Sequence, residues 1–266
     1  MTVERTILVS NDDGVNAPGL LALKQALETV ARVEILAPDR NWSAASRTRT
    51  FHKPMRVDEV RLLDGSSGRV SSGTPSDCVS LALLGLLDNH PDLIVTGIND
   101  GLNVGRDVSY SGTVAAALEG VRMGIPAVAV SYDTVSERPD APDYSAAAGF
   151  AARFVAFLLQ RGDFPQGILL NVNVPYAPPA RELEARITRL GGDAYSNYLV
   201  TGKDPQGRNF YWISGDPLTE GSKEGPETDI GAIAAGYVSV TPIHLDMTEH
   251  SMIPELSAWE KPLNTR

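Results

Sequence analysis

Strand-like and helix-like segments alternate along the chain as far as Val174, and this alternation restricts the fold more than any other feature of the sequence. Short apolar runs are followed by stretches in which apolar residues recur at helical spacing. This order is typical of a parallel sheet whose strands are joined by crossover helices, so we predict an α/β protein with a mostly parallel sheet. The predicted strands are Ile7–Val9, Val33–Leu36, Leu93–Val95, Ala127–Val130 and Leu169–Val174, and the predicted helices are Leu20–Val30, Pro75–Leu86, Thr113–Met123 and Tyr144–Leu159.

The character of the sequence changes after Pro175. Three prolines within Pro175–Pro179 interrupt regular structure and indicate a boundary. Short strand-like runs follow at Phe210–Ile213 and Tyr237–Thr241, with one predicted helix at Thr228–Ala235. We therefore predict a core at residues 1–180, and a β-rich C-terminal part at residues 181–266 that supplies closing elements and an oligomerisation arm.

Two adjacent carboxylates, Asp12 and Asp13, follow the first predicted strand. Like charges at contact distance disfavour joint ionisation unless a cation is present. The same stretch, with Asn11 before the acids and Gly14 after them, also suits a tight turn. The motif alone leaves both interpretations open, and this pair is the best candidate for a metal site in the sequence.

Polar residues also follow two other predicted strands. The loop after the second strand reaches Ser43, and Asn99 lies in the loop after the third. Ligands of open parallel sheets gather outside the carboxyl ends of the strands, so oxygen donors from three loops should meet at one edge. Carboxylate, amide and hydroxyl oxygens favour Mg²⁺ or Mn²⁺ over zinc. The four histidines are scattered and offer no ligand pair at a usual spacing: His52, His90, His244 and His250.

A turn of small polar residues, Ser111, Gly112 and Thr113, stands at the start of a predicted helix. Such a turn presents backbone N–H groups and hydroxyls to an anion, assisted by the helix dipole. Ser and Thr also cap helices for structural reasons alone. A hard-metal site at the same edge favours a phosphate pocket there.

Composition limits the partners. The formal net charge of −10 argues against a nucleic-acid groove or an anionic membrane. One cysteine, Cys78, excludes an intrachain disulfide and favours a reducing compartment, and we interpret it as a buried helix residue. The sequence shows neither a signal core nor a stretch approaching the roughly 20 apolar residues of a membrane span. We therefore predict a soluble, cytoplasmic protein. The motifs of dinucleotide-binding proteins, P-loop enzymes and serine hydrolases are missing.

Five segments of the chain read ILVSNDDGVNAPG, APDRNWSAAS, SGTPSDCVSLAL, GINDGLNVGRDVSYSGTVAAALEG and GYVSVTP. They resemble the successive signatures of the SurE family, the survival-protein 5'-nucleotidases. They occur in the family's order and extend from Ile7 to Pro242, so the resemblance covers nearly the whole chain.

The resemblance implies a divalent-metal-dependent phosphatase that acts on nucleoside 5'-monophosphates, with 3'-monophosphates and polyphosphate as further candidate substrates. It implies one Mg²⁺ or Mn²⁺ per subunit, held by Asp12, Asp13, Ser43 and Asn99. It also implies a Rossmann-like three-layer αβα core, and a C-terminal arm exchanged between the subunits of a homodimer or homotetramer. One departure concerns the arm: residues 225–229 read GPETD where family members often have EGTD. Thr228 and Asp229 are retained as a helix cap.

On this basis we hypothesise hydrolysis by a water that the cation activates, with Asp12 as the proton acceptor. Arg106 is a candidate cationic contact, although a solvated surface arginine is an equally ordinary interpretation. The predicted phosphate contacts are Asn11, Asn103, Ser111, Gly112 and Thr113.

Two other functions stay open at this point. A phosphatase of the haloacid dehalogenase type also places acids after its first strand, but its chemistry usually requires DxD, whereas here the acids are adjacent. A non-catalytic metal or nucleotide sensor has the same composition. The sequence does not fix the preferred base or the position of the ester.

Overall fold

The central feature of the computed structural model is a sheet with the strand order β3-β4-β2-β1-β5-β6-β7-β11-β8 among the described residues, which are 5–134, 142–177, 182–217 and 224–264. Within the series β4-β2-β1-β5-β6-β7 each strand runs parallel to the next, which confirms the prediction from the alternating pattern. The bounds of these strands are β1 (Thr6–Ser10), β2 (Arg32–Pro38), β4 (Ser67–Ser71), β5 (Leu93–Asp100), β6 (Ala127–Tyr132) and β7 (Ile168–Val174).

The two edges of the sheet contain strands that the apolar pattern did not predict. At one edge β3 (Val57–Arg61) pairs antiparallel with β4, and both have too few consecutive apolar residues to be recognised as strands. At the other edge β11 (Val238–His244) runs antiparallel to β7, and the short β8 (Ala185–Ile187) follows it. The predicted strand Tyr237–Thr241 is therefore confirmed as part of β11.

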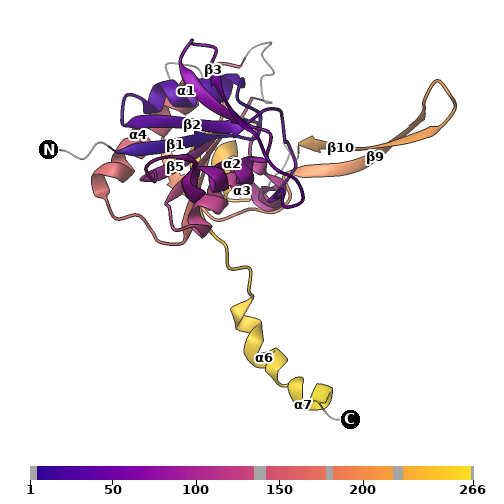
Figure 1. The fold of residues 1–266 in the computed structure, drawn as a ribbon. Helices are drawn as coiled ribbons and strands as arrows, with labels where there is room; N and C mark the ends of the chain where they lie inside the picture. Colours follow the sequence, from indigo (N-terminus) through magenta and orange to yellow (C-terminus); the bar gives the residue numbers. More distant parts are fainter. Residues whose placement is uncertain (1–4, 135–141, 178–181, 218–223, 265–266) are drawn as a thin grey trace.

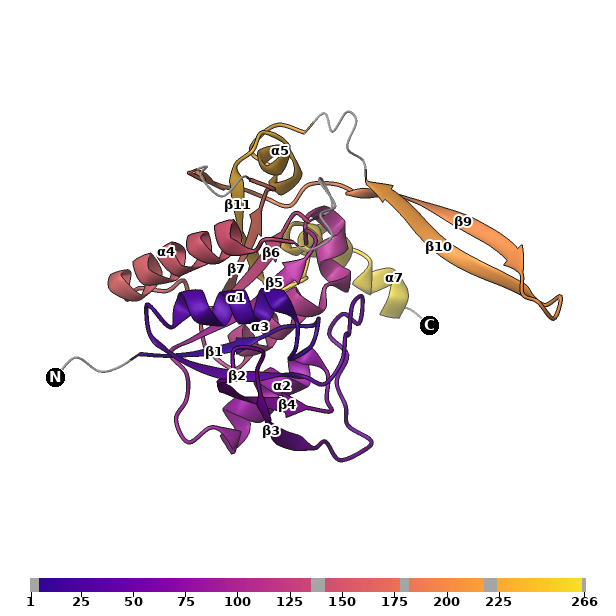
Figure 2. The same ribbon diagram turned by 90° about the horizontal axis from the view of Figure 1, so that it is seen from above.

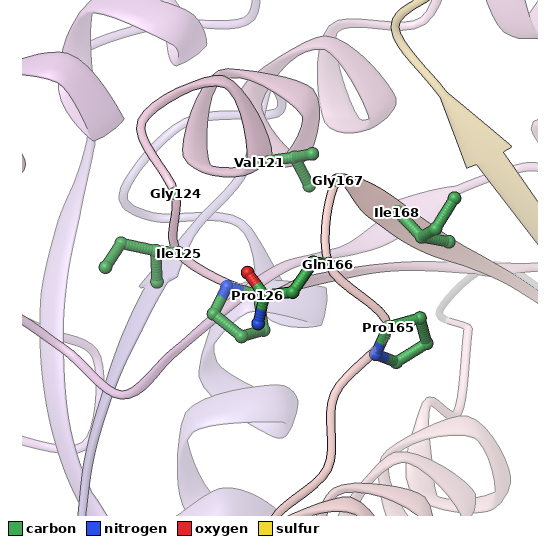
Figure 3. A pocket seen from close by; sticks show the side chains of 8 residues that line it. All are labelled: Val121, Gly124, Ile125, Pro126, Pro165, Gln166, Gly167 and Ile168. Carbon is green, nitrogen blue, oxygen red and sulfur yellow. The ribbon is translucent and has the colours of Figure 1, made fainter.

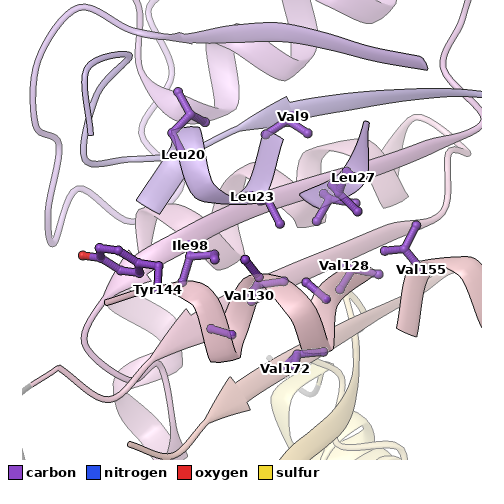
Figure 4. Close-up of a cluster of buried hydrophobic side chains, with 14 of the residues drawn as sticks. Val9, Leu20, Leu23, Leu27, Ile98, Val128, Val130, Tyr144, Val155 and Val172 are labelled. Carbon is purple, nitrogen blue, oxygen red and sulfur yellow. The ribbon is translucent and has the colours of Figure 1, made fainter. Parts of the chain in front are cut away.

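Helices cover both faces of the sheet, as the three-layer prediction requires. On one face α1 (Pro18–Leu27) and α4 (Ser145–Arg161) lie side by side (Figure 2) and pack on a cluster of buried apolar residues (Figure 4). On the opposite face α2 (Pro75–Leu81) and α3 (Gly112–Arg122) cover a second apolar cluster. Successive residues of β1 enter alternate clusters, since Ile7 and Val9 belong to the first and Leu8 to the second. Both faces of this strand are buried, which explains its uninterrupted apolar sequence.

The predicted helix Pro75–Leu86 is shorter than expected. It ends at Leu81 and continues as a single π-helical turn, η1 (Ala82–Leu86). Gly85 in this turn has φ +115°, a left-handed backbone conformation that cannot continue an α-helix. The helical spacing of the leucines therefore extends past the end of the α-helix.

The C-terminal third of the chain supplies two extensions. A hairpin of β9 (Tyr195–Lys203) and β10 (Asn209–Pro217) extends away from the sheet, and so does the terminal segment with α6 (Ile253–Ser257) and α7 (Glu260–Asn264) (Figure 1). Between them, α5 (Asp229–Ala234) confirms the predicted helix near Thr228 and precedes β11. Part of the predicted Pro175–Pro179 boundary lies outside the described residues, so the division at residue 180 stays a prediction.

None of the helices within the described ranges has both the length and the apolar character needed to cross a membrane.

The contact between α1 and the end of β5 generates a test of the fold. A Cβ atom on Gly19 would lie 2.2 Å from the backbone oxygen of Ile98, whereas one on Gly149 in α4 would meet only Arg153 Nη1 at 3.8 Å. We expect Gly19→Ala to lower the free energy of unfolding by about 1–3 kcal/mol, because the backbone of α1 or of β5 must shift to make room for the new methyl group. Gly149→Ala, the matched control, should raise it by about 0.5–1 kcal/mol. Urea denaturation measures both changes, and equal effects of the two substitutions would contradict the tight contact.

Candidate metal and phosphate site

The side chain of Asp12 lies at the carboxyl end of β1, directly against the first turn of α3. It is 3% exposed, and Asp12 Oδ1 accepts a hydrogen bond from the Thr113 hydroxyl. The same hydroxyl lies 3.3 Å from Asn99 Oδ1, at the end of β5. Gly112 fits here because it has no side chain: a Cβ atom would lie 2.7 Å from Asp12 Oδ2. The structure thus brings together Asp12, Asn99, Gly112 and Thr113, which the sequence analysis drew from three separate loops.

Asp13 faces the loop that follows β2 and the last residue of β5. Its Oδ1 accepts from Asn41 Nδ2 at 3.3 Å, and its Oδ2 accepts from the backbone N–H of Asp100 at 3.4 Å. Ser43 is exposed and joins this arrangement through its backbone N–H, which donates to Asn41 Oδ1 at 2.7 Å. Asn41 therefore connects Ser43 to Asp13. The sequence analysis did not assign Asn41 a role.

The two carboxylates lie in an environment that disfavours their charge. Burial raises the pKa of Asp12, although hydrogen bonds led by that of Thr113 oppose the shift. Burial, and to a smaller extent the neighbouring Asp12 carboxylate, together raise the pKa of Asp13 to about 6. A cation between the two groups would reverse both effects.

The donor set fits a hard divalent cation. Asn99 Nδ2 donates to the Gly101 carbonyl at 2.8 Å, which leaves Asn99 Oδ1 on the side of Thr113 and Asp12. Within the described residues, no group of three or more His, Cys, Asp or Glu side chains is arranged to hold a metal. Any cation here would therefore depend on two carboxylates completed by neutral oxygens, the ligands that Mg²⁺ and Mn²⁺ accept.

Asn11 closes the turn that carries the acids. Its Nδ2 donates to the Gly14 carbonyl at 3.0 Å, and its Oδ1 accepts from the Gly14 N–H at 3.2 Å. Gly14 has φ +102°, which glycine adopts without strain. The tight-turn interpretation of this motif is therefore confirmed, and it is compatible with a metal site because the turn directs both carboxylates toward the sheet edge. The predicted phosphate contact of Asn11 stays a prediction, since its side chain already bonds within the turn.

Ser111 caps α3. Its hydroxyl accepts a hydrogen bond from the Val114 N–H at 3.1 Å, so the capping interpretation is confirmed. Thr96 Oγ1 donates to the Thr113 carbonyl at 2.8 Å and ties the first turn of α3 to β5. The start of this helix is thus fixed beside Asp12, where its dipole favours an anion.

Asn103 is held by three buried side chains of β6 and β7. Its carbonyl accepts from Asn171 Nδ2 at 2.8 Å and Asn173 Nδ2 at 2.9 Å, and its N–H donates to Asn173 Oδ1 at 2.8 Å. Its own Nδ2 donates to Ser131 Oγ at 2.8 Å. The sequence analysis missed these partners, although two asparagines at alternate positions of an apolar strand were a visible signal. Whether Asn103 also contacts phosphate stays a prediction.

The comparisons with known proteins agree with this geometry. Residues 7–197 match the family model described as Survival protein SurE. A protein of Herpetosiphon aurantiacus named 5'-nucleotidase SurE is 49% identical over 94% of this chain and 96% of its own length. One of the same name from Chloroflexus aggregans is 46% identical over 96% of this chain and 98% of its own.

A crystal structure of the SurE protein from Aquifex aeolicus superposes with a TM-score of 0.81 at 36% identity, covering 96% of this chain and 99% of that one. This chain belongs to the SurE family. The family resemblance of the five sequence segments and the predicted α/β fold are therefore confirmed.

In this SurE chain, a shallow pocket lies far from the acids. It is formed at the amino ends of β6 and β7, the edge of the sheet opposite to Asp12 (Figure 3). Its lining contains no ionisable side chain, so it offers no group for acid–base chemistry. The residues around it are Val121, Gly124, Ile125, Pro126, Pro165, Gln166, Gly167 and Ile168.

Other residues of the sequence analysis lie outside the site. Cys78 is buried in the apolar cluster under α2, as predicted, and burial raises the pKa of its thiol well above the usual range. Arg106 is exposed and pairs with Asp193 at 3.2 Å, at the base of the hairpin. All four histidines are exposed: His52, His90, His244 and His250.

The raised pKa of Asp13 predicts how stability depends on pH. Its folded pKa of about 6 exceeds the unfolded value of 3.8, so ionisation opposes folding above pH 6 and has no effect well below pH 4. Without divalent cation, Asp13→Asn should therefore raise the free energy of unfolding at pH 8 by about 1 kcal/mol, less than the full shift implies because Asp13 is partly exposed. Urea denaturation in chelator from pH 4.5 to pH 8 measures this gain, which should shrink toward acid.

Asp58→Asn, at an exposed position of β3, serves as the control and should show no such trend. Added MgCl₂ or MnCl₂ should stabilise the wild type but not Asp13→Asn, because only a protein that binds the ion gains stability from it. A variant that loses stability at pH 8, or that still responds to the cation, would contradict the assignment.

Proposed function

We propose that this chain is a divalent-metal-dependent 5'-nucleotidase that hydrolyses nucleoside 5'-monophosphates to nucleoside and phosphate. The observation that carries the proposal is the Asp12–Asp13 pair. Asp12 is buried against the N-terminus of α3 and Asp13 is half-buried, and the pair has no neutralising side-chain cation among its described hydrogen bonds. Membership of the SurE family and the printed names of the curated relatives support it.

The residues proposed to hold one Mg²⁺ or Mn²⁺ per subunit are Asp12, Asp13, Ser43 and Asn99. Such an ion, when bound, polarises phosphoryl oxygens and lowers the pKa of a water molecule. Asp12 Oδ1 is occupied by the Thr113 hydroxyl, so Oδ2, beside Gly112, is the oxygen available to accept a proton.

The first turn of α3 is proposed to hold the phosphate. Backbone N–H groups at a helix start have no partner within the helix and point toward an anion. Gly112 keeps this turn in contact with Asp12, so the phosphate and the carboxylates would share one small volume. Thr113 orients Asp12 through its hydroxyl. Asn11, Asn103 and Ser111 complete the proposed phosphate environment.

The proposal includes nucleoside 3'-monophosphates and polyphosphate as further substrates. Every contact with substrate that is proposed here is to a phosphoryl group, and none of them distinguishes a base or the position of the ester. A panel of phosphate esters assayed with Mg²⁺ and with Mn²⁺ ranks the substrates. The single buried thiol, Cys78, accords with a reducing compartment, so the proposal places the enzyme in the cytoplasm.

The metal mechanism predicts the outcome of removing one charge. Asp12→Asn should lower kcat/KM for nucleoside monophosphate by at least about a hundredfold, because it weakens the metal site and removes the proton acceptor. Asp92→Asn is the matched control: Asp92 lies at the amino end of β5, bonded to the Thr6 N–H at 2.8 Å, and its loss should leave turnover unchanged. Phosphate release measures both.

Chelator should silence the wild type, and Mg²⁺ or Mn²⁺ should restore it. Turnover that survives exhaustive chelation, or full activity of a folded Asp12→Asn, would disprove the mechanism. A trapped phosphoenzyme would instead indicate covalent chemistry of the dehalogenase type. Nucleotide binding without phosphate release at any metal concentration would favour a sensor.

We further propose that the C-terminal arm, defined as Asp246–Asn264, is exchanged between subunits of a homodimer or homotetramer. Every residue of the arm is exposed, including the large apolar side chains of Leu256, Trp259 and Leu263. Helices this short are unstable in water without a packing partner, so the arm requires another surface. The hairpin offers a second apolar surface, with Trp212 68% exposed and Ile213 79% exposed.

Assembly should therefore depend on the arm. The full chain should be dimeric or tetrameric by size-exclusion chromatography with light scattering, and a Leu256→Glu, Trp259→Glu double variant should be monomeric because charge cannot be buried in the exchanged contact. Glu255→Gln with Glu260→Gln, at positions that flank Leu256 and Trp259, should keep the assembly. A monomeric wild type at micromolar concentration would overturn the proposal. Trp212→Ser should distinguish a dimer from a tetramer held by the hairpin.

A further inference from the structure

Asp229, the first residue of α5, connects two chain segments far from it in sequence. It is fully buried, and its Oδ2 accepts a hydrogen bond from the Gly105 N–H at 2.8 Å. Its Oδ1 accepts from the Gly191 N–H at 2.8 Å and from the N–H of its neighbour Ile230 at 2.8 Å. One carboxylate therefore binds the loop after β5, the segment before β9 and the start of α5.

The two segments that Asp229 connects touch each other directly. Gly105 has φ +54°, and a Cβ atom at this position would lie 2.0 Å from the Gly192 carbonyl oxygen. The same carbonyl accepts a hydrogen bond from the Arg106 N–H at 3.0 Å, and the Arg106 guanidinium pairs with Asp193 at 3.2 Å. Only glycine at position 105 allows the two backbones to approach this closely. The Asp229 carboxylate accepts hydrogen bonds from both of these segments, at Gly105 and at Gly191.

Helix capping does not account for Asp229. Thr228 is the N-cap of α5, since its hydroxyl accepts from the Gly231 N–H at 3.1 Å. Burial raises the pKa of Asp229, which means that its charged form is costly where it stands, and the three N–H donors offset this cost. The helix already has its N-cap in Thr228, so capping does not require a buried carboxylate at position 229. The role that remains is to connect Gly105 with Gly191, and we call this pair of hydrogen bonds the Asp229 bridge.

The bridged loop leads into the phosphate site. Gly105 lies two residues after Asn103, which is held by Asn173 of β7. The same connection continues through a short 3-10 helix, Gly105–Tyr110, to Ser111 at the start of α3. On the other side of the bridge, Gly191 lies four residues before β9, where the hairpin begins. The segment at the base of the hairpin therefore packs against the connection that leads from β5 to the phosphate site.

We propose that Asp229 is a positioning residue that fixes the loop Gly101–Tyr110 for phosphate binding and makes the base of the hairpin part of the site. The consequence for catalysis rests on the proposed phosphatase function, whereas the bridge itself does not. A displacement of the hairpin base should therefore also shift the loop Gly101–Tyr110 and, through it, the start of α3.

The first test compares Asp229→Asn with Thr228→Ala in the full chain. Asn has the same shape but directs an amide N–H at one of the N–H donors, so the loop loses an anchor while the fold is retained. We expect Asp229→Asn to lower kcat/KM by about tenfold to a hundredfold and to raise the inhibition constant of inorganic phosphate in parallel. Thr228→Ala removes the cap of α5 without touching the loop, and both constants should stay within about twofold of the wild type, measured well below either melting temperature.

The second test does not depend on activity. We would measure native-state hydrogen exchange of the wild-type chain at increasing urea concentrations below the unfolding transition. The amides of Gly105, Gly191 and α5 should become exchangeable in a single opening step, with the same dependence on urea. Asp229→Asn should speed exchange in Gly101–Tyr110, whereas Thr228→Ala should speed it only in α5. Separate opening of Gly105 and Gly191 in the wild type, or equal kinetic effects of the two variants, would overturn the proposal. Should the wild type prove inactive on every ester, the exchange data still decide whether the bridge exists.

Discussion

The contact between Asp12 and the first turn of α3 is the constraint on which the site depends. It is possible only because position 112 is glycine, since any side chain there would overlap the Asp12 carboxylate. The strand order sets up this contact, because β1 and β5 are neighbours and α3 follows β5 in the chain. The carboxyl ends of adjacent parallel strands share one edge, so the acids of the first strand and the helix start after the fifth must meet there.

The opposite end of α3 is held as firmly as its start. Glu119 is 1% exposed and lies 2.7 Å from Arg122 and 3.5 Å from Arg49, while Ser80 of α2 donates to it at 2.6 Å. Burial raises the pKa of Glu119, but these partners outweigh burial and hold it below the usual value. Arg49 belongs to the loop that carries Ser43, so this ion cluster fastens that loop to the same helix that faces Asp12. Removing one partner from such a buried cluster is costlier than the cluster's net contribution to stability.

The core and its acidic edge were predictable from sequence because their physical causes are local. A strand buried on both faces must be apolar throughout, and β1 shows this directly. Asp12 and Asp13 are conspicuous because two adjacent carboxylates come shortly after this apolar strand. The edge strand β3 (VDEVR) carries no such signature, since one partner strand and a wet surface tolerate charged residues. Asn41 and Asp229 were also missed or understated, because each acts on residues that only the folded chain brings near. Asp229 was expected to cap a helix, and nothing in its neighbourhood along the sequence indicates a partner at Gly105.

The charge balance at the carboxyl ends of the strands favours phosphate binding through backbone N–H groups and a cation. The chain has a formal net charge of −10, which repels an anion at long range. Four arginines in the loops after β2 and β5 lie near a carboxylate, whereas Arg56, directly before β3, forms no ion pair within the described residues. Arg40 lies 3.7 Å from Asp39, Arg47 and Arg49 lie 4.0 and 3.5 Å from Glu119, and Arg106 lies 3.2 Å from Asp193. Such pairs fix loops in place, but they offset the positive charge only in part, because Arg47, Arg49 and Arg122 share the single carboxylate of Glu119. Four of these arginines are engaged in ion pairs that fix loops. The start of α3 and the Asp12–Asp13 pair are further groups that can recruit an anion, the first through its dipole and the second only through a metal ion.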